Sequence, residues 1–89
     1  MSVMKQLIKK HVNDYFSNNC DQYLINCIEN NERYETVIGY AISHRNKILN
    51  NLESDNDYIN FFKDCDISYQ RMIDMIVDEI VNHVNNIWN

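Results

Sequence analysis

The feature of this sequence that most constrains its fold is the apolar pattern over residues 68–88. At about 100° per residue, the apolar side chains of this stretch lie on one arc of a helix and the polar side chains lie opposite. The arc comprises Tyr69, Met72, Ile73, Ile76, Val77, Ile80, Val84 and Ile87, and it is widened by Val81 and Trp88. Ser68 has a side chain suited to an N-cap. So wide an arc predicts a central helix that contacts two neighbours, or one neighbour and a second copy of the chain.

Similar patterns predict helices in the rest of the chain. We expect them over about 2–16, 21–30, 32–52 and 54–63. The chain has no proline, and Gly39 is its only glycine, so few residues interrupt a helix. The sequence therefore predicts an all-α fold, a small helical bundle of about four to five helices. Two long antiparallel helices, about 32–52 and 68–88, are joined in it by shorter ones.

The chain is expected to form one helical domain over residues 1–89, because no repeat or linker-like stretch divides it. A domain of this size buries only about 60–65% of the surface of its unfolded chain. Val3 and Met75 lie off the main apolar stripes, and the arc over 68–88 is too broad for one neighbour. This apolar surplus predicts a homodimer or an obligate hetero-complex.

The charge of the chain bears on its partners. Thirteen acidic residues outnumber eight basic ones, which gives a formal net charge of −5. Such a balance argues against non-specific binding to nucleic acid. The acidic residues are concentrated in the segment 53–66, which includes Asp55 and Asp57. We therefore expect the partner to be another protein, with a basic surface that meets these two carboxylates.

Cysteine usage and hydropathy bear on the compartment. Cys20, Cys27 and Cys65 are an odd number without CxxC spacing, which predicts reduced thiols in a cytoplasmic protein and no zinc site. No signal-peptide core and no membrane-spanning apolar run is recognised. The residues from Asp64 onward lack the glycine and the final carboxylate of a calcium loop. We expect no metal, no cofactor and no membrane association.

Arg45 interrupts an apolar arc. It falls at the centre of the arc predicted for 32–52, where an unpaired charge is costly. In a structural interpretation, its stem covers the core and its guanidinium pairs with Asp74 or Asp78. In a functional interpretation, it anchors an anion or a carboxylate of the partner. His11 and His83 also lie inside apolar arcs, as core or interface histidines or as ligands.

A short motif gives the sharpest enzymatic suggestion. The run His44-Arg45-Asn46-Lys47 resembles the phosphoacceptor box of one histidine-kinase subgroup, in which histidine is followed by arginine and, two residues later, by lysine. The resemblance covers four residues and implies a phosphotransfer domain that uses His44. Ile48 stands where that box has asparagine, and no glycine-rich ATP-binding segment follows. A surface histidine in a basic turn of helix is the alternative. No nucleophile–base pair or pair of catalytic carboxylates is recognised.

Three functions follow from these features. The first is a small acidic protein–protein interaction module, such as an inhibitor, immunity protein, antitoxin or phage or viral effector, which occludes a partner protein and is not an enzyme. Tyr40, a tyrosine expected at the surface, supports it because tyrosine is favoured at interfaces. The second is histidine phosphotransfer through His44. The third is sequestration of a small anionic ligand or nucleotide by Arg45 and His11. The candidate binding residues are Arg45, His44, Tyr40, His11, Asp55 and Asp57.

Overall fold

The computed structural model describes residues 3–62 and 67–89, and within them every regular element is an α-helix. These residues form α1 (Val3–Asn19), α2 (Asp21–Glu29), α3 (Tyr34–Ile42), α4 (Arg45–Glu53), α5 (Asn56–Phe61) and α6 (Tyr69–Trp88). The predicted all-α helical bundle is confirmed. The helices pack into an elongated body of 44 × 23 × 22 Å.

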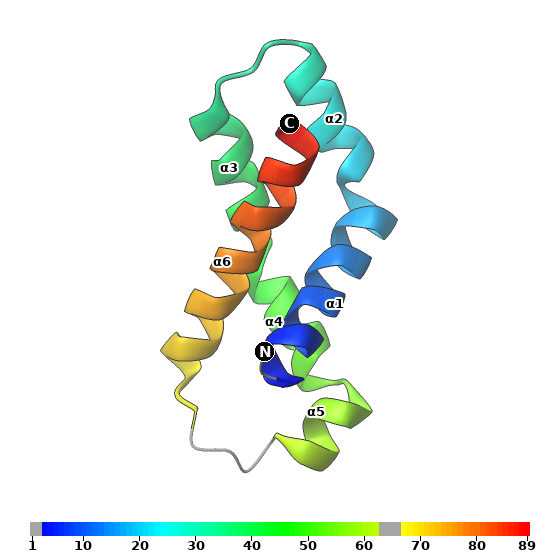
Figure 1. Ribbon diagram of the computed structural model, residues 1–89, viewed down its shortest axis with the longest axis vertical. Helices are drawn as coiled ribbons and strands as arrows, with labels where there is room; N and C mark the ends of the chain where they lie inside the picture. Colours follow the sequence, from blue (N-terminus) through cyan, green and yellow to red (C-terminus); the bar gives the residue numbers. More distant parts are fainter. Residues whose placement is uncertain (1–2, 63–66) are drawn as a thin grey trace.

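The C-terminal helix α6 is the central element. It packs against α1, α2, α3 and α4, with α1 alongside it and α3 and α4 running antiparallel to it (Figure 1). The predicted arc faces these neighbours, because its members Met72, Ile76, Ile80 and Val84 are buried. The predicted N-cap is also confirmed, since the Ser68 hydroxyl accepts a hydrogen bond of 3.1 Å from the backbone N–H of Arg71.

The helix predicted over about 32–52 differs from the observed structure in that it is divided into α3 and α4. At the division, the Ser43 N–H donates to the carbonyls of Gly39 and Tyr40 at 3.1 and 3.2 Å, and the His44 N–H donates to the Ala41 carbonyl at 3.2 Å. Bonds that reach back three residues tighten the chain relative to an α-helix. The two helices still follow one another along α6, as Figure 1 shows.

The beginning of this region also differs from the prediction. Asn31 has a left-handed backbone conformation with φ 63°, and α3 begins at Tyr34. Asparagine is one of the few residues that adopt this conformation readily. Gly39 lies on the exposed side of α3 and has no heavy atom within 4 Å of an added Cβ. Gly39 therefore lies on the polar face of this helix.

The core lies between α6 and the helices α1, α2, α3 and α4. Its fully buried side chains include Ile8, Phe16, Leu24, Ile48 and Ile80. The short helix α5 lies at one end of the bundle beside α4 (Figure 1). It has no buried residue. No helix in the described part of the chain is long and apolar enough to cross a membrane.

Candidate functional site

His44 lies at the division between α3 and α4, and this position turns its ring toward α1. His44 is the N-cap residue of α4. A hydrogen bond of 2.7 Å joins its Nδ1 to the Tyr15 hydroxyl of α1. Its Nε2 lies 3.8 Å from Sγ of Cys20, which stands between α1 and α2. Both ring nitrogens of His44 are therefore engaged with other side chains of the protein.

Tyr40 completes this polar cluster. Its hydroxyl donates to Sγ of Cys20 at 3.9 Å, and its ring lies against Tyr23 with the centroids 4.4 Å apart. Burial raises the pKa of Tyr40 to about 12, and the hydrogen bond to Cys20 adds to this effect. Burial also lowers the pKa of His44, and the charge of Lys47 adds to that. Near neutral pH, the cluster therefore consists of a neutral imidazole and protonated hydroxyls.

This geometry bears on phosphotransfer and on cysteine chemistry. A phosphoacceptor histidine needs a ring nitrogen open to the donor, whereas the nitrogens of His44 face Tyr15 and Cys20. Cys20 is only 6% exposed, and a reactive thiol needs both access and a thiolate-stabilising charge. A neutral His44 does not supply that charge. The geometry therefore indicates that this cluster holds α1, α3 and α4 together, and it does not favour covalent chemistry at His44 or Cys20.

His11, Asp55 and Asp57, which the sequence proposed as binding residues, lie together where α1 meets α5. Nε2 of His11 lies 2.6 Å from Oδ2 of Asp55. Asp55 is also the N-cap of α5, because its side chain accepts a hydrogen bond of 2.7 Å from the backbone N–H of Asp57. The hydrogen bond with His11 lowers the pKa of Asp55, and the Asp57 N–H and the charge of Lys10 add to this effect. The pair therefore fastens α5 to α1.

The other two residues that interrupt apolar arcs lie elsewhere. Nη1 of Arg45 donates to the Ile42 carbonyl at 3.2 Å, at the end of α3. His83 contacts oxygen atoms through both nitrogens, Nδ1 at 3.1 Å from Oδ1 of Asn13 and Nε2 at 2.7 Å from Oδ1 of Asp21. Its ring stacks on Phe16 with centroids 5.2 Å apart. Arg45, His11 and His83 therefore do not form one pocket.

An apolar groove lies between the first half of α1 and α5. Its volume is about 640 Å³, and it is lined by Val3, Gln6, Leu7, Lys10, Asp57, Phe61 and Phe62. Val3 is 65% exposed and Phe61 70% exposed. Asp57 is the only residue here that the sequence proposed for binding. The signals that could have found the groove are Val3, which lies off its stripe, and the adjacent phenylalanines Phe61 and Phe62 at the end of α5.

Metal binding and similarity to known proteins complete this description. No group of three or more metal-binding side chains occurs in the parts of the chain described, residues 3–62 and 67–89. Cys20 and Cys27 are free thiols, and the prediction for Cys65 lies outside those parts. No protein-family model, no curated protein and no solved structure matches the chain.

Proposed function

We propose that this protein is a small protein–protein interaction module that acts by covering a surface of a partner protein. The observation that carries the proposal is the groove between α1 and α5, where large apolar side chains are left exposed beside a well-packed core. Exposed apolar area that is gathered in one groove marks an interaction site more often than apolar residues scattered singly over a surface. An inhibitor, immunity protein, antitoxin or phage or viral effector that occludes its target acts in this way.

The charges at the groove define its occupant. Lys10 stands on the α1 side and Asp57 on the α5 side. A groove between two helices accepts an amphipathic helix that lays its apolar face against the groove. The occupant that fits is therefore a helix of the partner with a row of apolar side chains, a basic residue on the flank toward Asp57 and an acidic residue on the flank toward Lys10. The net charge of −5 favours a partner with an overall basic surface.

Neither alternative function gains a specific observation. Phosphotransfer through His44 meets a ring whose nitrogens are both engaged. An anionic ligand at His11 would lie beside the Asp55 carboxylate, 2.6 Å from the imidazole. The anion and the Asp55 carboxylate would carry the same charge and would repel each other, which disfavours an anion site.

Selection from a library of displayed amphipathic helices tests the proposal. We expect the selected helices to share an apolar row with one basic and one acidic flank. Their affinity should fall by about tenfold or more for Phe61→Asp, because a charge in an apolar contact costs more than 1.4 kcal/mol. Tyr69→Asp is the matched control, since Tyr69 is 62% exposed and does not line the groove. Enriched helices that bind Phe61→Asp as well as the wild type would contradict the proposal.

Sedimentation of the purified protein gives a second test. A monomer that binds the selected helices fits the proposed partner. A dimer that dissociates in Phe61→Asp but not in Tyr69→Asp would show instead that a second copy of the chain fills the groove. That result would overturn the assignment of the groove to a different protein.

A further inference from the structure

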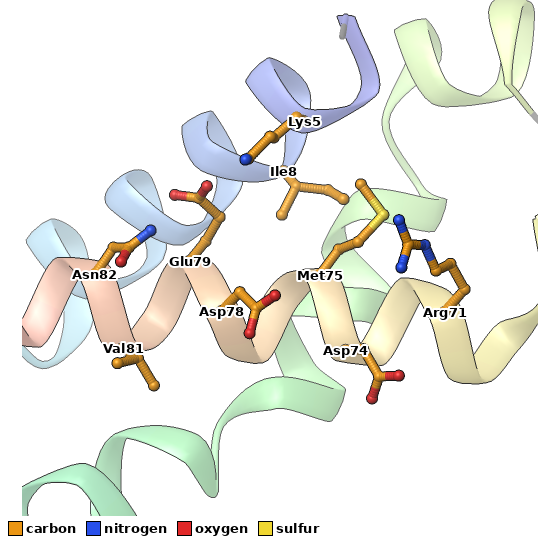
Figure 2. A pocket seen from close by; sticks show the side chains of 9 residues that line it. All are labelled: Lys5, Ile8, Arg71, Asp74, Met75, Asp78, Glu79, Val81 and Asn82. Atoms are coloured by element: carbon orange, nitrogen blue, oxygen red, sulfur yellow. The ribbon is translucent and has the colours of Figure 1, made fainter. Parts of the chain in front are cut away.

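The wall of the apolar groove on the α1 side is fixed by the core. Ile8 of α1 is fully buried, and Leu7, which lines the groove, is buried as well. Figure 2 shows Ile8 and Lys5 projecting from α1 toward α6. Helix α1 also packs against α2 and α4. A shift of this wall would therefore disrupt close-packed side chains on several sides.

The wall on the α5 side is held differently. Helix α5 has no buried residue, and Phe61, which lines the groove, is 70% exposed. Tyr58 and Phe62 are only partly buried against the core. The position of this wall therefore depends strongly on how α5 is attached at its beginning.

One carboxylate sets both the start of α5 and its distance from α1. Oδ1 of Asp55 accepts a hydrogen bond of 2.7 Å from the Asp57 N–H, and Oδ2 lies 2.6 Å from Nε2 of His11. The pKa of Asp55 is lowered by these groups, so its carboxylate is ionised near neutral pH and can only accept. Nε2 of His11 is therefore the donor. Only 15% of each of the two side chains is exposed, so water competes little for this bond.

We propose that His11 is a positioning residue for the groove, and that its hydrogen bond to Asp55 holds α5 where both walls contact a bound helix. His11 does not line the groove itself, so it acts through α5. The inference rests on the function proposed above and adds the residue that keeps the groove ready for its partner. Without this bond, the groove is formed in only a fraction of the molecules, and the apparent affinity falls in proportion to that fraction.

Three variants of α1 separate the hydrogen bond from the histidine ring. His11→Leu removes the donor but keeps an apolar side chain inside the apolar arc of α1, and it should weaken binding of the selected helices about tenfold. His11→Gln returns an N–H donor close to the position of Nε2 and should bind nearly as well as the wild type. Lys9→Leu places the same leucine at an exposed position of α1 that does not line the groove, and it should leave the affinity unchanged.

Binding kinetics show whether His11 acts through α5. Association should slow in His11→Leu, since fewer molecules have a formed groove, whereas dissociation should keep the wild-type rate because the bound contacts are the same. Hydrogen exchange of the α5 amides should accelerate in His11→Leu, and saturation with a selected helix should restore the wild-type exchange. The α6 amides should keep their protection, which shows that the variant is folded.

The outcomes distinguish this inference from the function of the groove. Wild-type affinity in His11→Leu, or equal losses in His11→Leu and His11→Gln, would overturn the inference and leave the proposed function standing. A loss caused by faster dissociation would also overturn it, because His11 would then contact the helix directly. So would unchanged α5 exchange in His11→Leu, whichever helices bind. Selected helices that bind Phe61→Asp as well as the wild type would instead refute the function of the groove, and the inference with it.

Discussion

The helices α5 and α6 meet the rest of the molecule in opposite ways. α6 buries four apolar side chains completely or nearly so, and it contacts helices on several sides. α5 buries none, although it carries Tyr58, Ile59 and Phe61 in a single short helix. Its cap residue is fastened to α1 by a polar contact, His11–Asp55. Apolar residues of α6 therefore form the core, whereas in α5 Tyr58 packs against the edge of the core and Ile59 and Phe61 are largely exposed.

The largest effect that tests this contrast is on stability. Ile80 is fully buried in α6 and Phe61 is 70% exposed in α5. Ile80→Ala should lower the free energy of unfolding by about 2–5 kcal/mol, since it removes buried methyl groups and leaves a cavity. Phe61→Ala should change it by less than about 0.5 kcal/mol, as is usual for surface positions. Urea denaturation measures both. A comparable loss in Phe61→Ala would show that α5 contributes to the core and would remove the contrast.

A smaller, local effect is expected at the contact that holds α5. Asp55→Ala removes both the N-cap of α5 and the partner of His11. We expect hydrogen exchange to accelerate at the α5 amides while the α6 amides keep their protection. Asp57→Ala is the matched control, because it removes the same charge from the same helix without touching His11. Equal acceleration in α5 and α6 would mean that the two helices unfold as one unit.

Acid should release the same contact. The pKa of Asp55 is lowered from its ordinary value of 3.8 mainly by His11. A lowered pKa means that the ionised carboxylate stabilises the folded state, and this contribution is present above the ordinary value. It is lost as the pH falls through the lowered pKa. We therefore compare hydrogen-exchange rates of the α5 amides in the wild type and in Asp55→Ala, after correction for the intrinsic effect of pH. At low pH the two proteins should exchange at the same rate.

In the well-packed part of the molecule, His44 should make the stability of the fold depend on pH. Burial holds its pKa below 6.5, so the unfolded chain takes up a proton at a higher pH than the folded protein. Stability is complete above 6.5, decreases as the pH falls toward the lowered pKa, and levels off below it. His44→Asn keeps a good N-cap and removes this titration. The pH dependence of the melting temperature should therefore be weaker in His44→Asn. Identical profiles would contradict the role of burial.

The sequence predicts the buried face of α6 but not the division between α3 and α4. The arc of Met72, Ile76 and Ile80 in α6 was recognised because a buried helix face leaves a periodic pattern. The division at Ser43 and His44 was not, since no proline or glycine marks it. It coincides with the contacts of His44 to Tyr15 and Cys20, which depend on how α1 packs.

The candidate binding residues show the same limit. The sequence proposes His11 on other grounds than the neighbouring Asp55 and Asp57, and the structure brings all three together where α1 meets α5. Arg45 was expected to pair with a carboxylate or to bind an anion, and its guanidinium instead contacts a carbonyl of its own chain. Pairing between helices depends on their rotation and relative height, which a pattern in one helix does not specify. Whether any of these residues binds a partner remains a prediction.

The smallest effect on stability is expected at Gly39, on an exposed side of α3 that does not line the groove. Gly39 lies in the interior of α3 with open space around it and no unusual backbone angle. Gly39→Ala should raise the free energy of unfolding by about 0.5–1 kcal/mol, because alanine loses less backbone entropy in a helix. The affinity of Gly39→Ala for helices selected on the α1–α5 groove should not change, whereas that of Phe61→Asp should fall by about tenfold or more. Weaker binding by Gly39→Ala would mean that a partner also approaches α3 closely. The exposed surface used for binding would then extend beyond α5 to α3, and exposure in α5 alone would no longer explain where the partner binds.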